Sequence, residues 1–124
     1  MDLFLSLKEK LDISDDDFKE ISKNLLSVKE TINNEKIEFG EQFEIGFYSH
    51  MISLFMRLKN NEKIDEVDMK VLDEIDEKVL EIAKKIVAPF FDKYKTKQNL
   101  SEIILVATHI QIAFNMRGGE ENVR

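Results

Sequence analysis

Proline and glycine are rare in this chain, which has one proline and four glycines among 124 residues. Residues that break regular structure are therefore scarce, while apolar side chains recur every three or four positions over long stretches. That spacing puts them on one face of an α-helix, which turns about 100° per residue. The sequence predicts an all-α fold, a compact bundle of four or five helices.

Polar residues mark the ends of the first two predicted helices. Ser14 precedes three aspartates and is typical of an N-cap, because its hydroxyl accepts a backbone hydrogen bond and the acids suit the positive end of a helix. We predict helices over about 15–32 and 40–59, each ended by a pair of asparagines.

An acidic segment follows, and its apolar residues again recur at helical spacing. The pattern predicts a helical stretch over about 62–86 with one buried stripe and a solvated acidic face. Its length favours a split near Asp73. Pro89 is expected to kink or end the stretch, because proline lacks a backbone donor and clashes with the preceding turn.

The last helix is predicted over about 100–116, with Asn99 as its cap and the glycine pair 118–119 as its stop. Repeats, low-complexity tracts and linkers are absent. We therefore expect a single domain over 1–124 with its core over about 14–117.

Composition excludes several kinds of chemistry. With no cysteine the chain has no disulfide, no thiolate metal site and no cysteine nucleophile. A net charge of -7 argues against general nucleic-acid binding. Only the lysines between 84 and 97, mixed with Phe91 and Tyr94, could contact RNA, and a solvated helix end is the favoured alternative. The first ten residues lack the features of a signal peptide, and no apolar run approaches the ~20 residues of a membrane helix, so a cytoplasmic protein is expected.

The chain has two histidines, His50 and His109, and each lies well inside a predicted helix. His50 falls at the edge of a strip of small and polar residues, with Arg57 two turns further along. A neutral imidazole there can attack a phosphoryl donor, and Arg57 can neutralise the resulting anion. The alternative is a boundary histidine that makes one hydrogen bond.

His109 shares a narrow polar ridge with Glu102, on a helix that is apolar almost all round and should be the central buried element. Burying an unpartnered polar ring costs about 1 to 3 kcal/mol, so His109 needs a partner, a water or a cleft. The alternative is a core histidine whose hydrogen bonds are satisfied.

The sequence lacks the motifs of the common metal, serine-nucleophile and phosphate-binding sites. Carboxylate-bridged metal sites in helical bundles use Glu-x-x-His, whereas Phe47 and Val106 stand three positions before the two histidines. Neither a Gly-x-Ser-x-Gly elbow nor a phosphate-binding glycine loop occurs. The sequence therefore predicts no metal, no cofactor, no catalytic residue and no enzymatic activity.

Two segments carry a family resemblance: FYSHMISLFMRL at 47–58 and EIILVATHIQIA at 102–113. The chain resembles the PTS regulation domain (PRD) family, in which one helix carries a histidine followed seven residues later by arginine. A later helix of that family carries glutamate, an apolar run and His-Ile. Both patterns are present here, at His50 and at His109, in the family's order.

The resemblance implies a bacterial regulatory module of the phosphoenolpyruvate-dependent sugar phosphotransferase system, linked to transcription regulation. It implies that HPr or a sugar-specific phosphotransferase component phosphorylates His50 and His109, with Arg57 and Glu102 neutralising or supporting the phosphate. Ser49 stands where family members often have an acid before the first histidine. Those members generally carry tandem copies joined to an RNA- or DNA-binding module, so this chain resembles a stand-alone, single-copy member.

Two hypotheses about function follow. In the first, the chain is a phosphorylated regulator, expected as a homodimer, that acts through changed protein association without contacting nucleic acid or membrane itself. In the second, it is a helical interaction scaffold that is never phosphorylated. Accessible histidines favour the first hypothesis, and sealed histidines favour the second.

Overall fold

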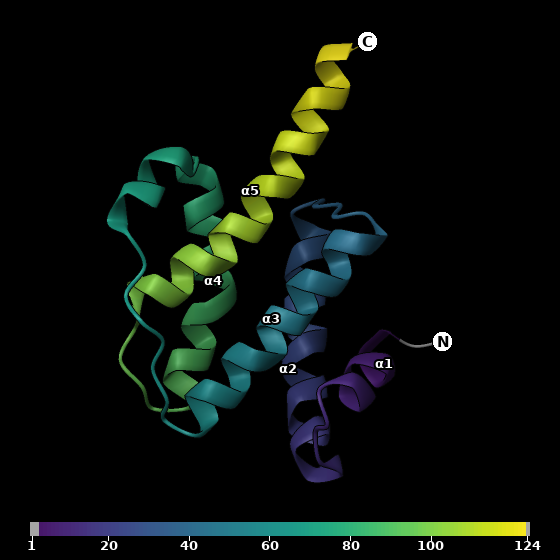
Figure 1. Cartoon of the computed structure of the whole chain (residues 1–124), viewed down its shortest axis with the longest axis vertical. Helices are drawn as coiled ribbons and strands as arrows, with labels where there is room; N and C mark the ends of the chain where they lie inside the picture. Colours follow the sequence, from purple (N-terminus) through teal and green to yellow (C-terminus); the bar gives the residue numbers. More distant parts are fainter. Residues whose placement is uncertain (1–2, 124) are drawn as a thin grey trace.

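The computed structural model describes the backbone of residues 3–123 and the side chains of residues 3–115. This part of the chain consists of helices joined by non-helical links and contains no strand, which confirms the all-α prediction (Figure 1). Its elements are α1 (Leu3–Lys10), α2 (Asp15–Asn34), α3 (Glu41–Lys59), the short 3-10 helix η1 (Met69–Glu74), α4 (Glu77–Lys93) and α5 (Leu100–Val123).

Helix α3 lies in the middle of the molecule, between α1 and α2 on one side and α4 and α5 on the other (Figure 1). The side of α5 that faces α3 and α4 is buried from Ser101 to Ala113, as predicted for a central helix. The last turns of α5 project beyond the other helices. Although α5 is long, neither it nor any other helix within residues 3–123 has the apolar stretch needed to cross a membrane.

The predicted ends of α2 and α3 are confirmed. The Ser14 hydroxyl accepts a hydrogen bond from the Asp17 backbone N–H at 3.2 Å, so it caps α2 as expected. Helix α2 ends at Asn34, and Asn60 forms the C-cap of α3. Local capping signals thus placed these two helices to within about two residues.

Four helices end in the same backbone arrangement without using glycine. A residue with φ between 53° and 57° follows each of them: Asp12, Lys36, Asn61 and Lys95. The next residue then donates a hydrogen bond back to a carbonyl five positions earlier, as Ile13 N does to Lys8 O at 3.1 Å. This is the Schellman motif, in which glycine normally takes the left-handed position. It explains how a chain with so few glycines turns sharply between its helices.

The acidic segment after α3 differs from its prediction. Residues 62–68 form no helix, η1 covers only six residues, and α4 begins at Glu77. The Val67 N–H donates instead to Ser101 Oγ on α5 at 3.0 Å. Apolar residues before Val79 are at most half-buried here, so helical spacing had no core surface to pack against.

Pro89 and the glycine pair 118–119 do not end their helices. Of the two outcomes expected at Pro89, a kink or an end, the end does not occur, because α4 continues through this exposed residue to Lys93. The two phenylalanines after the proline are buried, and their packing favours continuation of the helix. Helix α5 runs through the glycine pair 118–119 to Val123, so the predicted stop there is wrong. Glycine costs a helix about 1 kcal/mol but ends it only when the backbone adopts the left-handed conformation.

Helix α1 is an element that the sequence pattern did not predict. It is short, and it packs against α3 through Leu7, which is 2% exposed. Eight residues are too few for a helix to be stable alone, so this contact is what stabilises it.

Candidate functional site

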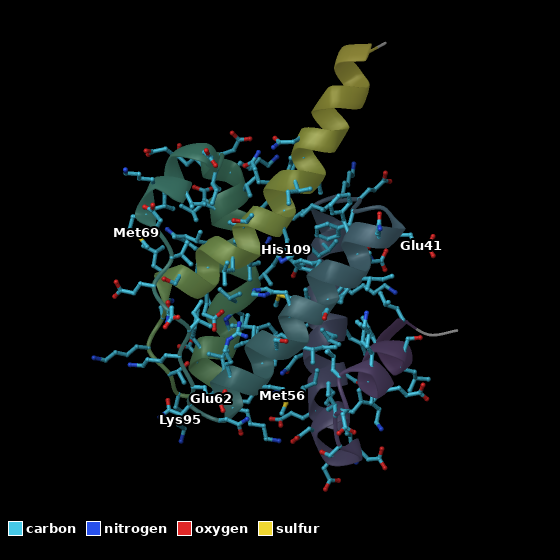
Figure 2. All side chains as sticks on the ribbon, viewed as in Figure 1. Glu41, Met56, Glu62, Met69, Lys95 and His109 are labelled. Atoms are coloured by element: carbon cyan, nitrogen blue, oxygen red, sulfur yellow. The ribbon has the colours of Figure 1, made fainter. Side chains whose placement is uncertain are left out.

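Helices α3 and α5 bring the two histidines of the chain together. The ring centroids of His50 and His109 lie 5.1 Å apart, and the ring planes are inclined by 33°. His50 comes from the middle of α3 and His109 from the middle of α5, where that helix passes α3 (Figure 2). Both side chains are half-buried. Two residues that are far apart in sequence therefore form one site.

The same two helices are joined a second time two turns away. Arg57 Nε donates to Glu102 Oε2 at 2.8 Å, and Arg57 Nη2 donates to Glu102 Oε1 at 2.7 Å. Arg57 stands seven residues after His50, and Glu102 stands seven residues before His109. Seven residues are close to two helical turns, so each helix presents its two residues on one face.

The two contacts show that α3 and α5 run antiparallel where they meet. We name this contact, defined by His50, Arg57, Glu102 and His109, the α3–α5 seam. All four residues stand out in the sequence, but helical spacing places Arg57 near His50 and does not predict its pairing with Glu102. The mirrored seven-residue spacings on the two helices were the signal that could have found this pairing.

At the arginine end of the seam, both carboxylate oxygens of Glu102 accept a hydrogen bond from Arg57. The side chain of Glu102 is 2% exposed and that of Arg57 is 19% exposed. Glu102 lies in the first turn of α5, where Asn99 Oδ1 accepts hydrogen bonds from the N–H groups of Ser101 and Glu102 at 2.9 and 3.4 Å. A carboxylate in a first turn also suits the positive end of the helix dipole. Helix geometry and charge therefore both hold Glu102 in place.

The histidine end is half-buried, and one of its ring nitrogens has no hydrogen-bond partner. Nε2 of His50 is enclosed and has no hydrogen-bond partner, a state that only Thr96 Oγ1 shares among the side chains of residues 3–115. Neither nitrogen of His109 is enclosed in this way. The ring of Phe47 meets His109 edge-on at 6.1 Å. A boundary histidine that makes one hydrogen bond through Nε2 is therefore not what His50 is here.

Burial sets the charge of the two rings. Burial first, and then the nearby His109 and Arg57, together lower the pKa of His50 from 6.5 to about 4. Burial also lowers the pKa of His109. Both imidazoles are therefore neutral near pH 7, and each has a ring nitrogen with a free lone pair.

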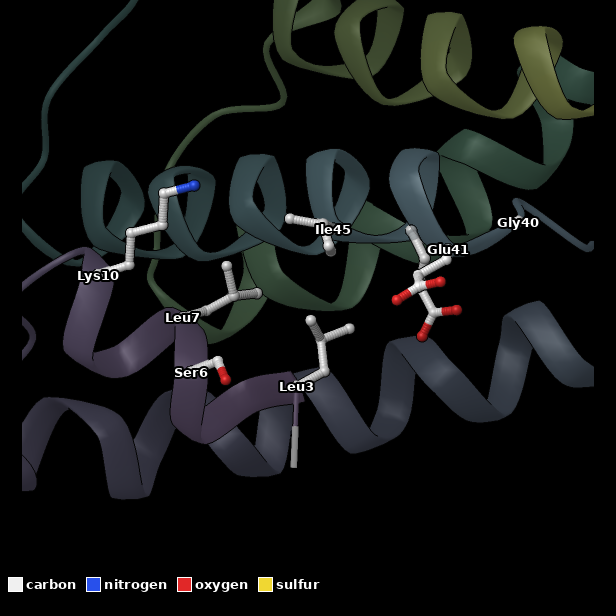
Figure 3. A pocket seen from close by; sticks show the side chains of 8 residues that line it. Leu3, Ser6, Leu7, Lys10, Gly40, Glu41 and Ile45 are labelled. Carbon is white, nitrogen blue, oxygen red and sulfur yellow. The ribbon is translucent and has the colours of Figure 1, made fainter. Parts of the chain in front are cut away.

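Two hollows in the surface lie away from the histidines. One of about 560 Å³ separates α1 from the start of α3 and is lined by residues such as Leu3, Lys10 and Glu41 (Figure 3). Another of about 230 Å³ lies where α3, α4 and α5 have their ends, and Glu102 forms part of its wall. Within the described chain, no three side chains of histidine, aspartate or glutamate lie close enough together to hold a metal ion.

Two of the lysines considered as an RNA contact have partners within the chain. Lys93 Nζ donates to Asn24 Oδ1 at 2.7 Å, and Asn24 in turn donates to the Tyr94 hydroxyl at 2.8 Å. Lys85 pairs with Glu35 at 3.4 Å. These contacts join α4 to α2, as expected for a solvated helix that also packs on its neighbour.

Comparison with known protein families identifies the chain. The sequence model of the PRD domain matches residues 26–113, a range that contains both histidines and the whole seam. The chain belongs to the PRD family. PRD domains are regulatory modules rather than enzymes, so membership implies a regulatory function related to the sugar phosphotransferase system. Neither a curated protein nor a solved structure matches this PRD.

Proposed function

We propose that this PRD is a phosphorylation-dependent regulator whose histidine pair receives a phosphoryl group from HPr or from a sugar-specific phosphotransferase component. The observation that carries the proposal is the pair of neutral, unpartnered imidazoles, His50 and His109, facing each other across the α3–α5 seam. Leaving the enclosed Nε2 of His50 without a hydrogen bond costs stability, and such costs concentrate at functional sites.

The neutral state of the rings suits the transfer. A ring nitrogen with a free lone pair attacks the phosphorus of the donor, so a new P–N bond forms while the bond between phosphorus and the donor side chain breaks, and the donor side chain takes up a proton from solvent. The acceptor ring then releases the proton of its other nitrogen to solvent. A protonated imidazole has no lone pair for this step, so the lowered pKa of both histidines favours phosphorylation at neutral pH.

Arg57 supports the product. Its positive charge already helps to lower the pKa of His50, because a cation disfavours a protonated ring nearby. The same charge favours a phosphoryl anion on that ring. Glu102 takes the role of holding the guanidinium in place through its two hydrogen bonds.

The added charge then changes protein association. A phosphoryl group carries about 1.5 to 2 negative charges, which a half-buried helix contact cannot accommodate without rearrangement. Phe43 lies seven residues before His50 on the same face of α3 and is 41% exposed. We propose that a second copy of the chain covers this face, so that a homodimer senses the phosphate and passes the signal to transcription control.

A direct test is to incubate the purified protein with phosphoenolpyruvate, enzyme I and HPr, and then with sugar-specific components, and to measure the intact mass. We expect an acid-labile adduct of one phosphoryl group that is lost in His50→Ala or in His109→Ala. Light scattering before and after phosphorylation then tests the change in oligomeric state. A mass that stays unchanged with every donor would overturn the proposal.

The second candidate is an interaction scaffold that is never phosphorylated. The enclosure of His50 Nε2 favours it, because a donor protein cannot reach that atom without movement of the seam. The scaffold predicts that binding to partner proteins is unchanged by phosphotransferase components. The same mass measurement therefore separates the two candidates.

A further inference from the structure

We infer that the histidine pair holds one phosphoryl group at a time, so that a charge on either ring excludes phosphorylation of the other. The inference rests on the proposed function and concerns how the same site is regulated. Its starting point is the 5.1 Å separation of the ring centroids of His50 and His109.

Charge is the first reason for exclusion. Two phosphoryl groups on rings this close would bring about three to four negative charges into a half-buried contact, where repulsion is stronger than in water. The positive group nearest to the pair along the seam is Arg57, and both of its hydrogen bonds in the seam already go to Glu102. Because Glu102 already offsets the charge of Arg57, the seam offers little positive charge to a first phosphoryl group and none to a second.

Hydrogen bonding is the second reason. A neutral imidazole carries one N–H, which can donate to the phosphate of a neighbouring ring. The pair is therefore well suited to one modified and one unmodified ring. Once both rings are phosphorylated, neither can serve as a neutral donor to the other without bringing like charges together.

The two rings are not equally open. Nε2 of His50 is enclosed, whereas neither nitrogen of His109 is. In the state described here, a donor protein meets fewer obstacles at His109, and His50 then acts as the positioning residue beside it. Two donors that prefer different histidines would compete for one phosphoryl position rather than act additively.

The test uses a fixed charge at one ring. His50→Asp places a carboxylate in the seam, and His50→Asn is its neutral match in size. We expect His109 to be phosphorylated at least about tenfold more slowly in the Asp variant than in the Asn variant, given the strength of charge repulsion at this distance. The reciprocal pair, His109→Asp and His109→Asn, should show the same difference at His50 where that ring accepts phosphate.

Intact mass of the wild-type chain provides the second readout. With donor in excess, we expect the mass to stop at one phosphoryl adduct per chain. Two adducts on one chain, or equal rates in the Asp and Asn variants with unchanged helical circular dichroism, would overturn the inference while leaving the proposed function intact. No adduct on any variant would instead remove the proposed function itself.

Discussion

The two ends of the α3–α5 seam are built from the same helices, yet they differ in whether their polar atoms have hydrogen-bond partners. Arg57 and Glu102 satisfy each other through two short hydrogen bonds. His50 and His109 face each other without any hydrogen bond from the described residues. One end is a structural clamp, and the other is a reactive pair that the clamp holds in position.

Within this one contact, the Arg57–Glu102 end contributes stability and the histidine end is the candidate for function. A buried polar group without a partner costs about 1 to 3 kcal/mol, so an unpartnered histidine end is expensive for a domain of this size. The clamp two turns away fixes the register of α3 against α5 and keeps the rings close. Each prediction below alters one end of the seam or serves as a control away from it.

Breaking the clamp should have the largest effect. Arg57→Met removes the guanidinium and leaves Glu102, which is 2% exposed, as an unpaired buried charge. We expect unfolding free energy to fall by about 3 to 5 kcal/mol. Urea unfolding followed by circular dichroism measures the loss.

The matched control for the clamp is the double variant Arg57→Met with Glu102→Gln, which removes the unpaired charge as well. It should recover a large part of the lost stability, because much of the cost lies in the isolated carboxylate. A single variant as stable as the wild type would show that the ion pair contributes nothing to the seam.

The pH dependence of stability should be the next largest effect, and it belongs to the histidine end. The pKa of His50 is about 4 in the folded chain against an ordinary value of 6.5. The unfolded chain therefore binds more protons than the folded chain between these values, so stability falls as pH is lowered from 6.5 to 4. The contribution of His50 to this loss is at most about 3 kcal/mol.

His50→Gln removes this titration and should flatten that part of the curve. Urea midpoints at several pH values for the variant and the wild type provide the measurement, and their difference cancels the slope that the carboxylates contribute. Parallel curves would mean that the folded environment does not oppose protonation of His50.

Much of this contrast could be expected from the sequence, and the limits have physical causes. Ser14, the asparagine pairs and the seven-residue spacings report local geometry, which a single helix determines by itself. The facing of His50 with His109 and the pairing of Arg57 with Glu102 depend on the register of two helices. The spacing of residues within one helix does not determine how that helix aligns with another.

The errors in the fold have a related origin. Residues 62–68 have helical spacing of apolar residues but no core surface to pack against. Helix α1 has only a weak apolar pattern, yet its Leu7 is buried in the core. Tertiary packing decided both cases against the local signal. The glycine pair 118–119 shows the same lesson, since a residue that permits a helix to end does not require it to.

Removing the unpartnered atom should stabilise the chain modestly. His50→Met keeps a flexible apolar side chain in the seam and deletes the enclosed Nε2. We expect a gain of about 1 kcal/mol together with loss of the pH slope assigned to His50. A clear loss of stability in thermal unfolding would show that Nε2 is hydrogen-bonded in solution, for example to a water.

A substitution away from the seam gives the smallest effect and sharpens the comparison. Lys95 follows α4 with φ 54°, and Asn61 follows α3 with φ 56°. Glycine adopts this left-handed backbone without strain, while asparagine tolerates it better than lysine does. Lys95→Gly should therefore stabilise the chain by about 0.5 to 1 kcal/mol, and Asn61→Gly by less.

Neither glycine variant changes a seam residue, so both should keep the wild-type pH slope and the wild-type extent of phosphorylation. His50→Met is expected to gain similar stability while losing the pH slope, because it removes a titrating group rather than backbone strain. If His50→Met and a glycine variant have equal urea midpoints but different pH slopes, the instability of the histidine end is tied to its chemistry. A glycine variant that lost the slope would instead mean that the pH dependence comes from the fold as a whole and not from the seam.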